Sequence, residues 1–231
     1  MVYKWLSIIQ NSLPGYCLLC GDHCRAGSGF DLCIPCRDAL PRNPRPCRHC
    51  GQPLVQGAVC GHCQRQPPPF AHTIAPWLYA PPLDSLILRL KTSAAMAPAR
   101  TLGHLLTTQV QAAAPLPQLL IPVPLHPLRL RERGFNQAAL LSRYLAGSLN
   151  LPWRPDLLEK VRESADQRGL DRRARQRNLR GCFRSRPLPP GCHVALVDDV
   201  VTTGATAWEA TRALQQAGAG QVDIWALART P

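Results

Sequence analysis

The feature that most constrains this chain is a set of four C-x2-C pairs within residues 17–63. Twelve residues separate the first pair from the second, and nine separate the third from the fourth. Each pair lets two thiolates bind one tetrahedral zinc ion, so eight ligands suit two four-cysteine sites and about two zinc ions. The segment is too polar to fold on an apolar core alone, and metal would supply its stability, on the order of 10 kcal/mol per site. The expected ligands are Cys17, Cys20, Cys33, Cys36, Cys47, Cys50, Cys60 and Cys63.

The sequence leaves the pairing of these ligands open. Consecutive pairing, first pair with second and third with fourth, is the simplest arrangement, and a cross-braced pairing is the alternative. Cys24 breaks the pattern and is either a free thiol or a replacement ligand, whereas the isolated Cys182 and Cys192 are interpreted as ordinary residues. Closed four-thiolate sites have no open position, so we interpret the zinc as structural. Three nearby histidines are interpreted as bystanders: His23, His49 and His62.

The N-terminal residues and the cysteine content favour a reducing compartment. Residues 1–15 lack the apolar core of about 7–15 residues that a signal peptide needs. No run approaches the ~20 apolar residues of a membrane span. We therefore expect a cytoplasmic protein without a membrane span, in which the 11 cysteines serve metal ligation more readily than disulfide formation.

After a Pro-rich stretch at residues 64–70, strand and helix patterns alternate. We expect strands at 73–79, 119–123, 157–161, 193–197 and 222–228, and helices at 83–90, 97–114, 135–149 and 205–217. This alternation predicts an α/β fold, a mostly parallel sheet with helices on both faces. The Pro-rich stretch is interpreted as a stiff linker. We therefore expect a small zinc-ribbon module at residues 1–66 and an α/β domain at residues 67–231.

A short polar motif follows the strand expected at residues 193–197. Asp198 and Asp199 come directly after the apolar run, and Thr202-Thr203-Gly204-Ala205-Thr206 then opens a helix. Unpaired N–H groups and a partial positive charge at a helix N-terminus hold a phosphate. The two carboxylates would repel a phosphate, but as acceptors they can hold two vicinal ribose hydroxyls. Neither G-x-x-x-x-G-K-[ST] nor G-x-G-x-x-G is present, which argues against the nucleotide sites built on those motifs.

This motif resembles the phosphoribosyl pyrophosphate (PRPP) motif of phosphoribosyltransferases, and segments upstream narrow the resemblance. Together with the cysteine-rich start they are similar to the ComF/GntX family over nearly the whole chain. The resemblance implies a type I phosphoribosyltransferase-like domain fused to an N-terminal zinc ribbon, and a link to DNA uptake or use in bacteria. It does not settle the reaction. The matching segments are Tyr79-Ala80-Pro81-Pro82-Leu83, Leu90-Lys91, Ile121-Pro122-Val123-Pro124-Leu125 and Arg133-Gly134-Phe135-Asn136-Gln137, followed by Gln167, Leu170, Arg173, Arg177-Asn178 and Phe183.

The resemblance also implies a place for pyrophosphate. The segment Val123-Pro124-Leu125-His126 would lie at the pyrophosphate loop, and Arg129 and Arg133 are the candidate ligands beside it, since guanidinium offers a planar fork for phosphate oxygens. The Arg-rich segment 162–186 is expected to be a mobile arm that closes over the substrate, with Arg173 and Arg177 as its candidates.

The net charge of the chain is compatible with two hypotheses about its function. The chain has 27 basic and 14 acidic residues and a formal net charge of +13, which suits a polyanionic partner. The first hypothesis is a phosphoribosyltransferase that binds PRPP with magnesium and lets a nucleophile displace pyrophosphate at the anomeric carbon. The second is a non-catalytic factor that senses PRPP, or that binds single-stranded DNA or proteins of the uptake machinery. Aromatic residues make up only 6% of the chain, which leaves few platforms for stacking bases.

Overall fold

The computed structural model describes residues 15–24, 31–92, 96–112, 115–163 and 178–231. Its helices are α2 (Ile34–Asp38), α3 (Gly61–Arg65), α4 (Leu83–Thr92), α5 (Met96–Gln111), α6 (Pro127–Arg133), α7 (Gln137–Leu149) and α9 (Ala205–Gln216). Its strands are β1 (Gly15–Tyr16), β2 (His23–Cys24), β3 (Thr73–Ile74), β4 (Trp77–Leu78), β5 (Leu119–Pro122), β6 (Leu158–Lys160), β7 (Phe183–Ser185), β8 (Cys192–Val201) and β9 (Ala219–Arg229).

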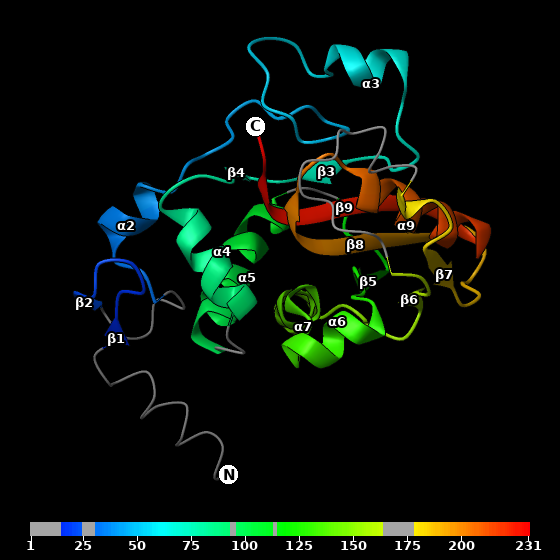
Figure 1. Ribbon diagram of the computed structural model, residues 1–231. Coiled ribbons are helices and arrows are strands. Elements are labelled where there is room, and N and C mark those ends of the chain that lie inside the picture. Colours follow the sequence, from blue (N-terminus) through cyan, green and yellow to red (C-terminus); the bar gives the residue numbers. More distant parts are fainter. Residues whose placement is uncertain (1–14, 25–30, 93–95, 113–114, 164–177) are drawn as a thin grey trace.

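The centre of the molecule is a parallel sheet with strand order β3-β9-β8-β5, and β4 also pairs with β9. Alternate residues of β8 and β9 point to opposite faces, and both faces are covered by helices (Figure 1). Val194 and Leu196 pack with Leu214 of α9, whereas Ala195 and Val197 pack in the core that α4, α5 and α7 form. The predicted fold class, a parallel α/β sheet with helices on both faces and a small cysteine-rich module, is confirmed.

Three elements differ from the expected pattern. The strand expected at residues 73–79 is split into β3 and β4, because Pro76 lies between them and cannot donate to a ladder. An unexpected helix, α6, follows the expected pyrophosphate loop; Pro127 is its first residue and Gly134 ends it in the left-handed region, with φ 78°. Within the Arg-rich segment, β7 pairs antiparallel with β6. Residues 164–177 of that segment lie outside the described residues, and with them Gln167, Leu170, Arg173 and Arg177.

The two cysteine clusters attach to different parts of the α/β core, and Figure 1 shows α2 and α3 well apart. The first packs through Leu32 and Leu40 into the core of α4 and α5, and Asp31 receives two bonds of 2.7 Å from Arg100 of α5. The second cluster lies against β3 and the end of β9, where Thr73 bonds the carbonyls of residues 48 and 49. No helix in the described part of the chain has the length and apolar character that crossing a bilayer requires.

Candidate functional site

The sequence motif at residues 198–206 forms the turn from the end of β8 into α9. Strand β8 continues through Asp198 and Asp199 to Val201, four residues further than expected. Gly204 has φ 79°, a left-handed conformation that strains other residues, and it precedes the first turn of α9. The Thr203 hydroxyl accepts a bond from the Ala205 N–H at 3.4 Å. The N-terminus of a twelve-residue helix therefore lies at the carboxyl edge of the parallel sheet, the usual position for ligands in such folds.

The loop encloses a small cavity. Its volume is about 20 Å³. Asp198, Thr202, Gly204 and Thr206 all line it, together with Val123 from the end of β5. The fold thus brings together residues of the predicted PRPP motif and the beginning of the expected pyrophosphate loop.

The two carboxylates have different surroundings. Asp199 is only 5% exposed, and its Oδ2 lies 2.6 Å from Nζ of Lys91. Asp198 is partly exposed, and its Oδ1 accepts the backbone N–H of Asp199 at 2.8 Å. Burial, followed by the neighbouring charge of Asp199, raises the pKa of Asp198 well above its usual value.

Lys91 is a site residue to which the sequence analysis assigned no role. Burial alone would lower the pKa of Lys91, but the charge of Asp199 and the hydrogen bond with it outweigh burial and raise the pKa. Lys91 lies in the last turn of α4, next to the buried Ile87 and Leu90. The sequence signal for Lys91 was its position beside the apolar stripe of an amphipathic helix, because a cation at such a position borders the core.

A second lysine lies near the carboxylates. Lys160 ends β6, and its Nζ lies 5.9 Å from the ring centroid of Phe183. Burial lowers its pKa, against the charges of Cys182, Glu163 and Asp198. The antiparallel pair of β6 and β7 thus presents a cation to the side of the site where Asp198 lies.

The arginine candidates are only partly brought to the site. Arg129 is exposed and is paired with Glu132 at 3.1 Å and Glu163 at 3.6 Å. Arg133 donates to Oε1 of Gln137 at 2.8 Å, in the first turn of α7. Asn136 caps that helix through the Ala138 N–H and donates to the Val123 carbonyl at 3.0 Å, which ties α7 to the end of β5.

The eight predicted ligands form two clusters, and the pairing is consecutive. Within each cluster all four sulfur atoms lie within 4.8 Å of one another: Cys17, Cys20, Cys33 and Cys36 in the first, and Cys47, Cys50, Cys60 and Cys63 in the second. Tetrahedral zinc with Zn–S bonds of about 2.3 Å requires sulfur atoms about 3.8 Å apart. The separations of Cys20 from Cys33 and of Cys50 from Cys60 are both 3.7 Å, so the clusters fit zinc. Cys24 is buried but belongs to neither group of four, which identifies it as a thiol outside the ligand sets.

Backbone hydrogen bonds favour the thiolate of one ligand in each cluster, since, against burial, they lower the pKa of Cys17 to about 6 and act on Cys47 in the same way. Burial would raise the pKa of Cys47, but backbone hydrogen bonds from Cys50, Cys60 and His49 outweigh it and lower the pKa to about 7. Cys47 is fully buried, whereas Cys20 of the first cluster is exposed. The two zinc positions therefore differ in their access to solvent.

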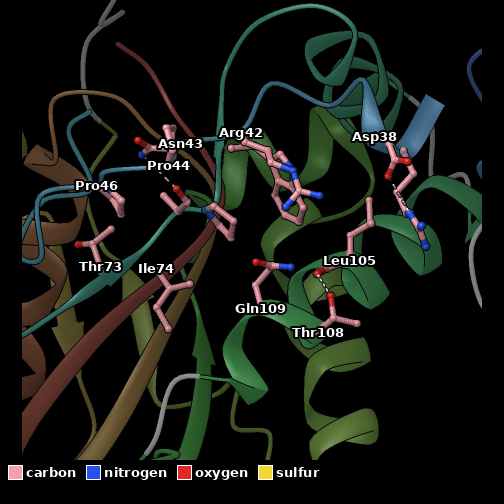
Figure 2. Close-up of a pocket in the computed structure, with 14 residues that line it drawn as sticks. Asp38, Arg42, Asn43, Pro44, Pro46, Thr73, Ile74, Leu105, Thr108 and Gln109 are labelled. Carbon is pink, nitrogen blue, oxygen red and sulfur yellow. Dashed lines mark hydrogen bonds and ion pairs between the residues drawn. The ribbon is translucent and has the colours of Figure 1, made fainter. Parts of the chain in front are cut away.

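A larger cavity lies between the segment that connects the clusters and the edge of the sheet. Its volume is about 620 Å³. Figure 2 shows Arg42 and Asn43 from the connecting segment, Ile74 from β3 and Gln109 from α5 around it. None of the loop residues 198–206 lines this cavity, so it is separate from the phosphate loop.

Comparison with known proteins agrees with this architecture. A family model described as "Double zinc ribbon domain" matches residues 8–64. The "DNA utilization protein YhgH" of Salmonella typhi is 37% identical over 225 residues, 95% of this chain and 99% of that protein. "Competence protein F" of Haemophilus influenzae is 36% identical over 219 residues, 90% of this chain and 95% of that protein. "Competence protein ComFC" of Bacillus subtilis is 33% identical over 115 residues, 48% of this chain and 45% of that protein.

Solved structures give partial likenesses. The crystal structure of a Thermus thermophilus protein, TT1426, covers 58% of this chain and 83% of its own, with 18% identity and a TM-score of 0.35. The adenine phosphoribosyltransferase of Leishmania tarentolae covers 60% of this chain and 73% of its own, with 14% identity and the same TM-score of 0.35.

Fold and ligand clusters together define a class: a parallel α/β domain that carries a double zinc ribbon with two structural four-cysteine zinc sites. Within that class, the chain belongs to the competence and DNA-utilisation family of YhgH and competence protein F, the ComF/GntX family that its motifs indicate.

Proposed function

We propose that this protein binds PRPP, or a related ribose 5-phosphate, with magnesium on the loop at residues 198–206, and that it serves DNA uptake or nucleotide use in the cytoplasm. The observation that carries the proposal is the pair Asp198 and Asp199 directly before the N-terminus of α9, at the carboxyl edge of a parallel sheet. The names of the relatives support the link to DNA use.

The chemistry divides between the two ends of the loop. Backbone N–H groups of the first turn of α9, with the hydroxyls of Thr202, Thr203 and Thr206, would hold the 5-phosphate. Asp198 and Asp199 would accept bonds from the ribose hydroxyls. Asp199 would share its carboxylate with Lys91, whose ammonium then limits the repulsion between an anionic ligand and the acidic pair.

Transfer of the phosphoribosyl group would depend mainly on position and charge. Displacement of pyrophosphate at the anomeric carbon places positive charge on the ribose and negative charge on the leaving group. Magnesium, when bound with PRPP, would neutralise pyrophosphate oxygens. Arg133 bonds Gln137, whose neighbour Asn136 donates to the Val123 carbonyl after the end of β5. We propose Arg133 as a ligand for the leaving group, with Arg129 once its acidic partners are displaced.

Isothermal titration with PRPP tests the proposal, with and without magnesium. Zinc-loaded protein is expected to bind, and ribose 5-phosphate is expected to compete. Thr206→Val should weaken binding a few-fold because the backbone N–H groups remain. The matched control is Thr211→Val on the same helix, whose buried hydroxyl finds no partner among the described residues. Absence of binding by the parent protein would remove the proposal.

A second candidate function is contact with single-stranded DNA at the cavity in Figure 2. Arg37 and Arg42 line this cavity together with the apolar Ile74 and Trp77, and Figure 2 shows Arg42 and Ile74 at its wall. Such a surface suits phosphates beside unstacked bases. Arg42→Ala is expected to weaken binding and reduce its salt dependence more than Arg143→Ala, an equal charge change on the exposed side of α7. Equal effects of the two variants would favour a nonspecific charge effect and reject this site.

A further inference from the structure

A buried arginine joins the second zinc cluster to the phosphate loop. Arg229 is the last residue of β9 and is 4% exposed. Its Nε donates to the carbonyl of Cys50 at 3.0 Å, and its Nη1 donates to the carbonyl of Val201 at 3.1 Å. Cys50 is a ligand in the second cluster, and Val201 is the residue directly before Thr202. One guanidinium therefore touches both a zinc knuckle and the phosphate loop.

Further contacts fix the geometry of this bridge. Nη2 of Arg229 donates to Oε1 of Gln52 at 2.7 Å, and the N–H of Thr230 donates to the Val201 carbonyl at 3.0 Å. Gly51 has φ 70°, and a Cβ built there would lie 3.0 Å from Cγ2 of Thr73 and 3.7 Å from Cδ of Arg229. The knuckle thus approaches the end of the sheet so closely that only glycine suits its turn.

Metal bound at the second cluster would hold the knuckle from the other side. Zinc would fix the backbone of residues 47–50 through two sulfur ligands, and so the direction of the Cys50 carbonyl. A buried guanidinium needs acceptors for its N–H groups, because an unsatisfied charged donor is costly. When the knuckle unfolds, Arg229 loses the acceptors of residues 50 and 52, and its bond to Val201 is expected to rearrange.

We propose that Arg229 is a positioning residue through which zinc at the second cluster orders the phosphate loop, so that the zinc content of this site controls the affinity of the loop for PRPP. The affinity part rests on the proposed function, whereas the ordering of the loop does not. The first cluster is the natural comparison, since Arg100 joins it to α5 without touching residues 198–206 in the described contacts.

Hydrogen exchange of the full-length, zinc-loaded protein tests the ordering. Cys63→Ser is expected to lose one zinc ion and to raise exchange roughly 10-fold at the amides of Trp208 and Thr230, which donate to the carbonyls of Gly204 and Val201 in the loop. Arg229→Gln should keep both zinc ions and raise exchange at the same amides. Arg229→Lys, which keeps the charge but cannot reach Cys50 and Val201 together, should behave like Arg229→Gln. The matched controls Cys36→Ser and Arg100→Gln should leave these amides unchanged.

Each alternative outcome has a definite meaning. Unchanged exchange at the Trp208 and Thr230 amides in a Cys63→Ser protein that has lost one zinc overturns the proposal. Loss of protection throughout β8 and β9 also overturns it, because the zinc would then hold the whole sheet. Normal behaviour of Arg229→Lys would assign the effect to charge and reject the bridge. PRPP titration of the same proteins should show about 10-fold weaker binding for Cys63→Ser and Arg229→Gln. If the parent does not bind PRPP, the proposed function fails while the exchange result still decides the bridge.

Discussion

Replacing Asp198 with asparagine is expected to stabilise the protein while it weakens PRPP binding. Asp198 is adjacent to Asp199, and Lys91 lies within ion-pair distance of the Asp199 carboxylate. Asparagine keeps the oxygen that accepts the Asp199 N–H at 2.8 Å and removes one of the two like charges. A residue selected for folding alone would show the opposite behaviour, since its removal would lower stability.

The size of the expected change in stability follows from the charges of the two carboxylates and of Lys91. Two unit charges 4 Å apart interact by about 4 kcal/mol at an effective dielectric constant of 20. The Lys91 ammonium offsets most of this repulsion, which leaves a gain of about 1 kcal/mol for Asp198→Asn. For a chain of 231 residues this corresponds to a rise in melting temperature of roughly 2–4 °C. A charge-assisted bond to a ribose hydroxyl is worth about 1.5–3 kcal/mol, so PRPP affinity should fall by roughly 10- to 100-fold.

The pH dependence of the gain has a definite sign. The pKa of Asp198 is raised in the folded protein above its usual value of 3.8. The contribution of the Asp198 carboxyl to the free energy of unfolding is therefore fully present below pH 3.8 and is lost as the pH rises through the folded-state pKa. The difference in melting temperature between Asp198→Asn and the parent should widen as the pH rises from about 4 to about 8.

Thermal melts over this pH range and PRPP titrations on the same preparations measure both effects. Asp156→Asn is the control, because a hydrogen bond from Arg154 lowers the pKa of Asp156 to about 2 and the side chain is exposed. It should not raise the melting temperature or change PRPP affinity. A lower melting temperature for Asp198→Asn together with unchanged affinity for PRPP would refute the reasoning.

The structure makes two further predictions. Chelator should remove zinc in two phases, the first from the cluster with the exposed Cys20 and the second from the cluster with the buried Cys47. In a chromogenic zinc assay, Cys36→Ser should lack the fast phase. A single phase in the parent would contradict the difference in solvent access between the clusters. Lys91→Met and Asp199→Asn should each lower the free energy of unfolding, measured by urea unfolding. The loss in the double variant should be smaller than the sum of the two single losses by about 1–3 kcal/mol. Additive losses would mean that the 2.6 Å pair carries no coupling energy.

Local patterns predicted most of the elements and the metal ligands. Cysteine spacing identified all eight zinc ligands, because two residues between thiols set a knuckle whatever surrounds it. The apolar run before Asp198 and the glycine at position 204 likewise predicted the strand, turn and helix around the loop. Strand β7 was missed because only Phe183 of its three residues is buried, so the Arg-rich composition concealed a strand.

Long-range contacts of the site could not be predicted from the sequence. The ion pair of Lys91 with Asp199 joins the end of α4 to β8, and the periodicity of neither segment indicates which residue the other one pairs with. The contact of Arg229 with Cys50 has the same character, since it depends on how a zinc knuckle docks onto the last strand. Both arise from packing between elements that are distant along the chain, and each requires the assembled sheet before the two groups meet.

The placement of the two zinc clusters gives the ribbon a role beyond its own stability. The first cluster packs against α4, where Arg89 donates to the Leu18 carbonyl, and the last turn of α4 carries the Lys91 that pairs with Asp199. The second cluster reaches the opposite end of the acidic motif through Arg229. Each cluster therefore contacts an element that holds one flank of the loop at residues 198–206. In the described contacts, the second cluster reaches residues 198–206 directly through Arg229, whereas the first cluster reaches only Lys91, by way of α4. Loss of zinc from the first cluster is therefore expected to leave the amides that report on the loop unchanged.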